Sequence, residues 1–190
     1  LTNAETPPVD PFAEWLKANR LPKRNRRQTS ISTEERSGRD WLKALGALRQ
    51  CGGSRGFPRR VMADYLILTL CWGARKGEAS RLKVADIDFE REFVVFRDTK
   101  TNVEHCFPLT PACATLLRKR IEDNNQPRGR EVEKAAKGEP HYVPEWVFPS
   151  QRRGKHITNP SGVLEVAASA SGLKATTYDL RRGFAGAIAV

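Results

Sequence analysis

The feature that most constrains the fold is an apolar segment at residues 61–71. Pro58, just before it, is suited to the first turn of a helix. A helix that is apolar nearly all round has to be covered by other elements. We therefore expect a central helix that begins near Pro58. Its apolar residues are Val61, Met62, Tyr65, Leu66, Leu68, Leu70 and Cys71.

A junction of glycine and charged residues follows this helix. Gly73 and Arg75 precede a short polar helix that carries Glu78 and Leu82. An arginine placed after a helix-ending glycine can turn toward a ligand, and its planar five-donor fork suits a phosphate. An arginine between helices is more often a surface residue or the partner of a carboxylate, here Glu78. This window alone leaves both interpretations open.

The composition is that of a folded protein with a polyanionic partner. The 190 residues are 39% hydrophobic and 29% charged, enough for one domain, or for one domain and part of another. Lys and Arg number 33 against 22 Asp and Glu, which gives a net charge of +11. Such an excess favours polyanions through attraction and counterion release. We expect nucleic acid first and an anionic membrane second.

No window is apolar for the roughly 18 residues of a membrane span, and the N-terminus lacks a signal pattern. We expect a soluble, intracellular protein. The cysteines form no C-x-x-C pair, so we expect no metal site and reduced, mostly buried thiols. They are Cys51, Cys71, Cys106 and Cys113.

The N-terminal part reads as a linker followed by a helix. Residues 1–30 end in a basic run that either is solvated or contacts a phosphate backbone, and its members are Lys23, Arg24, Arg26 and Arg27. A capping box at residues 32–35 opens a helix. Trp41, Leu42, Leu45 and Leu48 form its apolar face, which ends at Gly52-Gly53.

After the junction the pattern changes to short strands. The segments 84–89, 93–96 and 103–109 predict a three-stranded antiparallel sheet, with Lys100 at the tip of its second turn. Thr110-Pro111 then caps another helix. The fold class is therefore α+β, mostly helical with one small antiparallel sheet.

The C-terminal part begins with the longest loop, residues 123–145, in which little apolar periodicity is present. Residues 146–148 form a short buried segment. A helix starts at Asn159-Pro160 and is closed by Gly172. A second capping box, residues 176–179, opens the final helix.

With these pieces in order, residues 31–190 resemble the catalytic domain of tyrosine recombinases, the family of phage integrases and Xer-type recombinases. Four stretches carry the resemblance in sequence order: Ser32 to Glu35, Gly73 to Glu78 with Leu82 and residues 86–88, Thr99-Lys100, and Tyr178 to Ala185. Each stretch is weak alone, and the ordered set is fairly specific.

The resemblance implies a role for each matching residue. Arg75 and Arg181 would grip the scissile phosphate, and Lys100 would be the general acid toward the leaving 5′-oxygen. Two fixed guanidinium groups stabilise the charge that builds on the phosphate, without a metal or a cofactor. Glu78 would hold Arg75 in place. Arg182 and the basic run of the linker are the remaining expected DNA contacts.

Two departures from the family pattern are visible. Tyr178 stands where the family usually has histidine, and a phenol with a pKa near 10 is a poor general base at neutral pH. We expect it to contact phosphate. None of Tyr65, Tyr142 and Tyr178 matches the family's nucleophile, which lies beyond the second arginine. We expect residues 1–30 to be a linker remnant after a missing DNA-clamping domain, and 31–190 an incomplete catalytic domain.

The resemblance also implies a cytoplasmic, nucleoid-associated protein of bacterial or phage origin. The expected partners are double-stranded DNA and other recombinase subunits, although this chain alone would be an inactive monomer that binds DNA weakly. Two alternatives stay open. A catalytically inactive DNA-binding relative would share the fold and the charge, and Tyr178 favours it. A basic RNA-binding protein would show exposed aromatic residues near its basic clusters.

Overall fold

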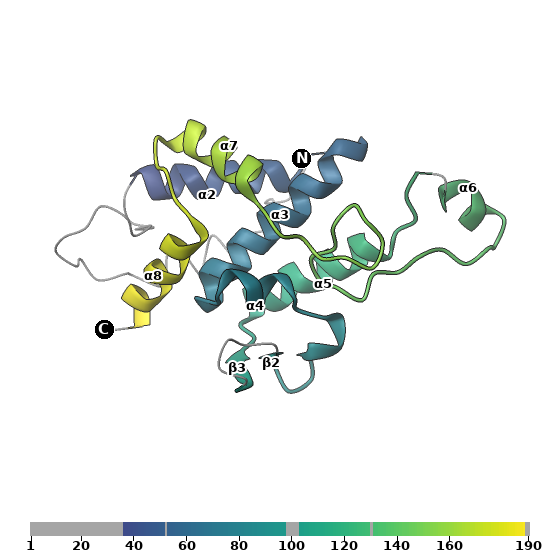
Figure 1. Ribbon diagram of the computed structural model, residues 1–190, viewed down its shortest axis with the longest axis horizontal. Helices are drawn as coiled ribbons and strands as arrows, with labels where there is room; N and C mark the ends of the chain where they lie inside the picture. Colours follow the sequence, from purple (N-terminus) through teal and green to yellow (C-terminus); the bar gives the residue numbers. More distant parts are fainter. Residues whose placement is uncertain (1–35, 52, 98–102, 130, 189–190) are drawn as a thin grey trace, which may run out of the picture.

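The helix α3 (Gly53–Trp72) lies at the centre of the computed structural model, which describes residues 36–51, 53–97, 103–129 and 131–188. In Figure 1, α3 crosses the middle of the molecule, with α2 and α7 side by side along one flank. The expected central helix is confirmed. The helices that pack against it are α2 (Arg36–Arg49), α4 (Lys76–Ser80), α5 (Pro111–Asn125), α7 (Ser161–Ser171) and α8 (Thr177–Ile188).

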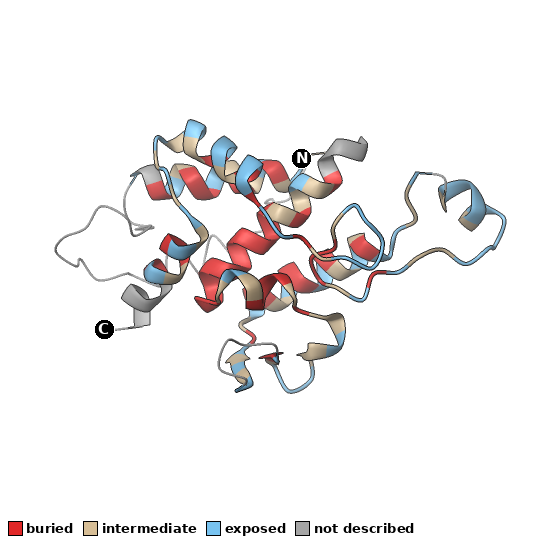
Figure 2. Ribbon diagram, viewed as in Figure 1, coloured by how far each residue is buried: buried red, intermediate tan, exposed pale blue. Residues whose placement is uncertain are grey.

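Burial explains why α3 is central. Figure 2 shows buried residues along most of α3 and on the faces of the neighbouring helices that meet it. Val61, Leu66 and Leu68 are fully buried, and the expected apolar face of α2 is buried as well, with Trp41 and Leu45 at 0% exposure. Removing this apolar surface from water is the main source of stability for such a core.

The start of α3 differs from the sequence expectation. The helix begins at Gly53, so Pro58 lies inside it and not in its first turn. Proline inside a helix removes one backbone hydrogen bond. Phe57, the residue before it, is buried in the core. We attribute the longer helix to this packing, which holds the turn that precedes Pro58.

The predicted three-stranded antiparallel sheet is confirmed, in the order β1 (Ile87–Asp88), β2 (Phe93–Phe96) and β3 (His105–Pro108). Val94 pairs with Ile87 on one side and with Phe107 on the other. The first strand is shorter than expected. Val84–Asp86 forms a 3₁₀ turn in which the Asp86 carboxylate accepts from the backbone N–H of Lys83 at 3.2 Å.

The expected loop at residues 123–145 is partly wrong. α5 continues to Asn125, and a further helix, α6 (Glu131–Ala136), lies within the segment, away from the body of the molecule in Figure 1. Its first turn carries Glu131 and Glu133, which favour the positive end of a helix. An exposed helix lacks the apolar period by which buried helices are recognised.

The first helix, α2, ends at Arg49, before the expected Gly52-Gly53, but three other predicted helix ends agree with the structure. Thr110 accepts from the backbone N–H of Cys113 at the start of α5. Gly172 has φ of 71° and closes α7. At the start of α8 the Thr176 hydroxyl accepts from the N–H of Asp179, and the Asp179 carboxylate accepts from the N–H of Thr176. The second capping box is therefore confirmed.

The remaining expectations concern the cysteines, membrane spans and residues that the structure does not describe. Cys71 and Cys113 are buried, whereas Cys106 on β3 is exposed, so the prediction of burial is wrong for it. In the described part of the chain no helix is long and apolar enough to cross a membrane. Residues 1–35 lie outside the described residues, with the linker and the first capping box, and so does Lys100.

Candidate active site

The first part of the site is the turn between α3 and α4. Gly73 ends α3 with φ of 58°, a left-handed conformation that disfavours residues with a side chain. Ala74 is buried at 1% exposure, and Arg75 is the N-cap residue of α4. The buried alanine fixes the chain so that the arginine beside it emerges at the surface, where 40% of its side chain is exposed.

Glu78 holds Arg75 through both of its carboxylate oxygens. Oε1 accepts from Nη1 of Arg75 at 2.8 Å, and Oε2 accepts from the backbone N–H of Arg75 at 3.0 Å. The pairing that the sequence left open is therefore present. It uses one of the five N–H donors of the guanidinium group. Pairing with Glu78 and binding of a phosphate are thus compatible.

The electrostatics of Glu78 show how it can stay charged although only 6% of its side chain is exposed. Burial raises the pKa of the Glu78 carboxyl, but the hydrogen bonds from Arg75 and the charges of Arg75 and Arg181 outweigh it, so the pKa is lowered below its ordinary value. The carboxylate is therefore ionised at neutral pH, and two arginines act on it.

Arg181 approaches this junction from α8. Its Nη1 donates to the carbonyl oxygen of Gly73 at 2.9 Å, a contact between positions 108 residues apart. Leu180, the residue before it, is fully buried and anchors α8 against the body of the protein. Arg75 and Arg181 therefore meet at one helix junction, since one contacts Glu78 and the other contacts Gly73 while its charge acts on Glu78.

Tyr178 and Arg182 lie on the outer side of α8. Tyr178 is 60% exposed, and the guanidinium carbon of Arg182 lies 4.7 Å from the centre of its ring. Tyr178 precedes Arg181 by three residues, so both lie on neighbouring positions of one helix face. The structure thus brings Arg75, Glu78 and Arg181 together at the junction, while Tyr178 and Arg182 contact each other on α8.

Two supporting contacts were not anticipated. The buried hydroxyl of Tyr65 donates to the carbonyl oxygen of Lys76 at 3.0 Å and ties the first turn of α4 to α3. Burial raises the pKa of Tyr65 to about 12. The second contact is that of the Gly73 carbonyl oxygen with Arg181. The contact of Tyr65 could have been predicted, because a tyrosine in an apolar run is buried and a buried phenol needs a partner. The contact of the Gly73 carbonyl could not, because no sequence pattern identifies a backbone acceptor.

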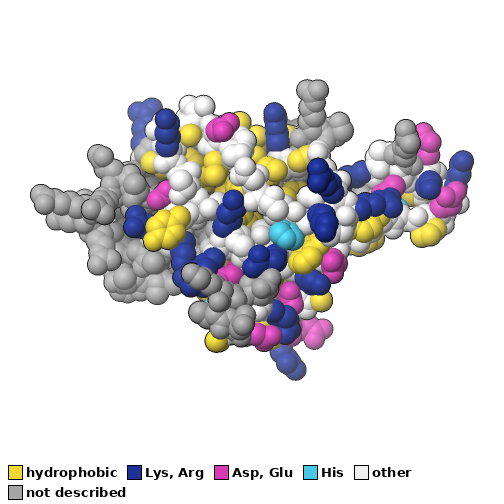
Figure 3. All heavy atoms as spheres, viewed as in Figure 1, with side chains coloured by type: hydrophobic (Ala, Val, Ile, Leu, Met, Phe, Trp, Pro, Cys, Tyr) yellow, Lys and Arg dark blue, Asp and Glu magenta, His cyan; other side chains and the backbone are white. Residues whose placement is uncertain are grey.

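Basic side chains spread over the face of the molecule that is drawn in Figure 3. Figure 3 shows Lys and Arg groups over α8, over α3 and over the loop that precedes α7, with few acidic groups among them. Two fixed guanidinium groups within such a face can each donate hydrogen bonds to a phosphate and offset its negative charge. Within the described residues no group of three or more His, Cys, Asp and Glu side chains could hold a metal ion.

The fold and this junction define a helical domain with a small antiparallel sheet and paired arginines. A family model described as the phage integrase family matches residues 48–189. The chain belongs to the phage integrase family. The match spans the junction at Arg75 and continues through α8, so both arginines fall inside it.

Known relatives agree with this assignment. The tyrosine recombinase XerA of Pyrococcus furiosus is 27% identical over 137 residues, which are 67% of this chain and 41% of the relative. A crystal structure of XerH recombinase in a pre-cleavage complex with its difH substrate has a TM-score of 0.57 at 19% identity, covering 87% of this chain and 42% of that one.

A lambda integrase dimer bound to a core site has a TM-score of 0.51 at 17% identity, covering 93% of this chain and 59% of that one. At these identities the solved structures establish the fold alone. The chain spans less than half the length of the XerA relative.

Proposed function

We propose that this chain is the catalytic part of a tyrosine-type site-specific DNA recombinase and that it binds a phosphate of double-stranded DNA between Arg75 and Arg181. Recombinases of this kind cut and rejoin DNA through a 3′-phosphotyrosyl intermediate. The observation that carries the proposal is the contact of Arg181 with Gly73, which joins the two arginines at one junction. The net charge of +11 favours the same partner.

The proposed chemistry is electrostatic. Attack on a phosphodiester places negative charge on the non-bridging oxygens, and guanidinium groups that are already fixed stabilise this charge without reorganising. Glu78 fixes Arg75, and the Gly73 carbonyl fixes Arg181. Lys100 keeps its proposed role as general acid on the strength of the family resemblance.

None of the three tyrosines is suited to be the nucleophile. Tyr65 is 1% exposed and hydrogen-bonded, and the hydroxyl of Tyr142 accepts from the backbone N–H of Gly154 at 2.8 Å. We assign Tyr178, which is exposed beside Arg181, to phosphate contact. We therefore propose that this chain binds DNA without forming a covalent adduct, and that it does so as a monomer, other subunits joining only in a recombination assembly.

Binding of a labelled duplex as a function of salt tests the proposal. We expect affinity to fall steeply with salt, and Arg75→Ala to weaken binding and to reduce the slope of log K against log salt by about 0.9. Arg91→Ala, at an exposed arginine of the sheet turn paired with Asp88, is the matched control and should change little. Salt-independent binding, or equal effects of the two variants, would contradict the proposal.

A DNA-binding relative without cleavage activity is the second candidate, and Tyr178 in place of histidine favours it. In either candidate the Tyr178 hydroxyl can contact a phosphate. If it contacts the phosphate of a recombination site, Tyr178→Phe should weaken duplex binding by about 0.5–1.5 kcal/mol, because one hydrogen bond is lost. Unchanged binding of Tyr178→Phe beside weakened binding of Arg75→Ala would contradict the assignment of Tyr178 to phosphate contact.

A further inference from the structure

A second basic site lies in the loop that precedes α7. Residues 149–156, which we call the basic hairpin, contain Arg152, Arg153, Lys155 and His156. Pro149 pairs with His156 in an antiparallel bridge, and the backbone N–H of Ser150 donates to the carbonyl of Lys155 at 2.8 Å. The flanking Phe148 and Ile157 are buried, so both ends of the hairpin are anchored in the core.

Aromatic side chains fix the tip of the hairpin. Gly154 has φ of 69°, its N–H donates to the hydroxyl of Tyr142 at 2.8 Å, and its carbonyl accepts from the indole N–H of Trp146 at 3.2 Å. The Trp146 ring also lies edge to face with the His156 ring at 5.1 Å. The charged side chains are thus carried by a backbone that is already ordered before a ligand arrives, which lowers the cost of binding.

The hairpin separates two hollows of different charge. On one side Arg152, Lys155 and His156 line a hollow of about 610 Å³ together with Phe57 and Met62 of α3. None of the described residues that line it is acidic. We call it the cationic hollow. Ser150, Gln151, Thr158 and Asn159 add polar groups to its wall.

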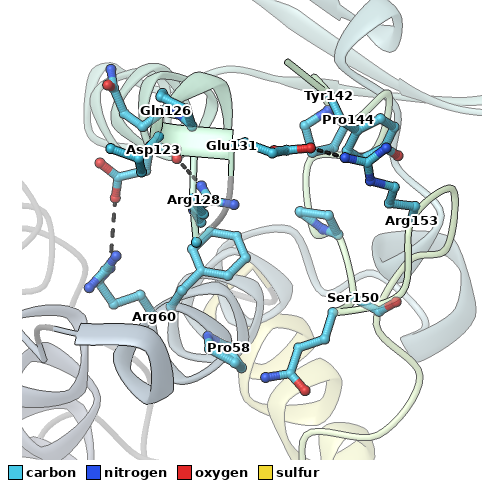
Figure 4. A pocket seen from close by; sticks show the side chains of 16 residues that line it. Pro58, Arg60, Asp123, Gln126, Arg128, Glu131, Tyr142, Pro144, Ser150 and Arg153 are labelled. Carbon is cyan, nitrogen blue, oxygen red and sulfur yellow. Dashed lines mark hydrogen bonds and ion pairs between the residues drawn. The ribbon is translucent and has the colours of Figure 1, made fainter. Parts of the chain in front are cut away.

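The hollow on the other side is larger, about 770 Å³, and it carries acidic as well as basic side chains (Figure 4). Arg153 pairs there with Glu131, and Arg60 lies 4.0 Å from Asp123. By contrast, Arg152 and Lys155 are exposed and make no ion pair with another described residue. The unbalanced positive charge of the hairpin is therefore on the side of the cationic hollow.

We propose that the cationic hollow binds the phosphate backbone of duplex DNA at a second place, through Arg152 and Lys155. This inference rests on the proposed function. Met62 lines the hollow, and Trp72 ends α3 just before the Arg75 junction, ten residues further along the helix. Ten residues of helix span about 15 Å. At about 3.4 Å per base pair this distance is four to five base pairs.

His156 contributes differently from its neighbours. Its Nδ1 lies 2.8 Å from the carbonyl oxygen of Ile157, which can only accept, so Nδ1 carries a proton. In the neutral ring Nε2 is then an acceptor and cannot bind an anion, whereas the imidazolium form donates there. We therefore assign the phosphate contacts to Arg152 and Lys155, whose charged groups contain donors and no acceptor.

The test measures binding of a random-sequence 20-base-pair duplex by the full 190-residue chain across a salt series. We expect the double variant Arg152→Ala/Lys155→Ala to bind more weakly and to lower the slope of log K against log salt by about 1.8, the value for two phosphate contacts. Arg153→Ala is the matched control, because this neighbouring arginine pairs with Glu131 on the other side of the hairpin. It should leave the slope unchanged.

The outcomes separate this inference from the proposed function. If Arg75→Ala weakens binding and the double variant does not, the cationic hollow is no DNA contact and the phosphate site at Arg75 stands. Equal loss of slope in Arg153→Ala and the double variant would also overturn the inference, since the charge would act without regard to the hollow. If the unaltered chain binds no duplex at all, both proposals fail.

Discussion

Glu78 is a charged residue of the site whose side chain is almost completely buried. A buried carboxylate is costly unless it is paired and hydrogen-bonded, and removing one partner leaves the other charge unsatisfied. Glu78 meets this requirement with bonds from the backbone and the side chain of Arg75. Its charge is therefore part of what orients the arginine, as the position three residues after Arg75 led us to expect.

At this residue we predict that Glu78→Gln lowers the free energy of unfolding by about 1.5–3 kcal/mol at pH 7, the range for hydrogen bonds to charged groups. The folded pKa of Glu78 is lowered, so its stabilisation is full above the unfolded value of about 4.3 and is lost as the pH falls through the folded value. Urea unfolding of both proteins between pH 3 and 7 measures this difference.

Glu90→Gln is the control, because Glu90 is exposed in the turn between β1 and β2. Its unfolding free energy should stay within about 0.5 kcal/mol of the unaltered protein. A Glu78→Gln difference that does not shrink toward pH 3 would show that the carboxylate charge is not what stabilises Arg75.

At the scale of elements, the site depends on how α3 ends and how α8 begins. Gly73 turns the chain so that its carbonyl meets Arg181, and the Thr176–Asp179 cap fixes the start of α8, which carries Tyr178 and Arg181. Such helix ends satisfy backbone groups that have no partner inside the helix. The same contacts that finish the helices thereby set the positions of the arginines.

We predict that Gly73→Ala weakens duplex binding as well as stability. A residue with a side chain in a left-handed conformation costs about 1–2 kcal/mol, and relief of this strain moves the carbonyl that holds Arg181. Gly172→Ala is the matched control, because Gly172 ends α7 with a similar φ of 71°. Thermal unfolding should report a loss in both variants, and a duplex titration should report a loss only in Gly73→Ala. Unaltered binding by Gly73→Ala would contradict the role of this carbonyl.

Sequence patterns predicted those parts of the fold that local chemistry decides. Residues within or next to these elements predict them: the caps at Thr110 and Thr176, the glycine at position 172, which has no Cβ, and the apolar run of α3. The two helices that the sequence predicted incorrectly also have local causes. Packing of Phe57 lets α3 begin on the N-terminal side of Pro58, and the exposed α6 has no apolar face by which it could be predicted.

At the scale of the whole molecule, a buried polar network was the least predictable feature. Arg120 of α5 is 0% exposed and donates to Asp64 of α3 at 3.1 Å, and Asp64 also accepts from Arg49 of α2 at 2.7 Å. Sequence marks Arg120 as unusual only by its place on the apolar spacing of Leu116 and Leu117. Its partner, 56 residues away, is not predictable from local pattern.

This network connects three helices around the core without adding much stability. Burial raises the pKa of Asp64 despite the nearby charges of Arg120 and Arg49, and burial lowers the pKa of Arg120. In both cases desolvation outweighs the attraction between the charges. Such a buried pair is therefore weak evidence for stability. What it does supply is a fixed contact between α3, which leads to Arg75, and the helices packed on either side.

The central claim is that Arg75 and Arg181 bind one phosphate, and a double-mutant cycle on duplex affinity tests it most directly. Arg75→Ala, Arg181→Ala and the double variant are titrated with the same duplex at fixed salt. Groups that share a ligand or a network show interaction energies of about 0.5–3 kcal/mol, whereas distant independent sites add within about 0.5 kcal/mol. We predict an interaction energy of at least about 1 kcal/mol. Strict additivity of the two losses would contradict the shared phosphate.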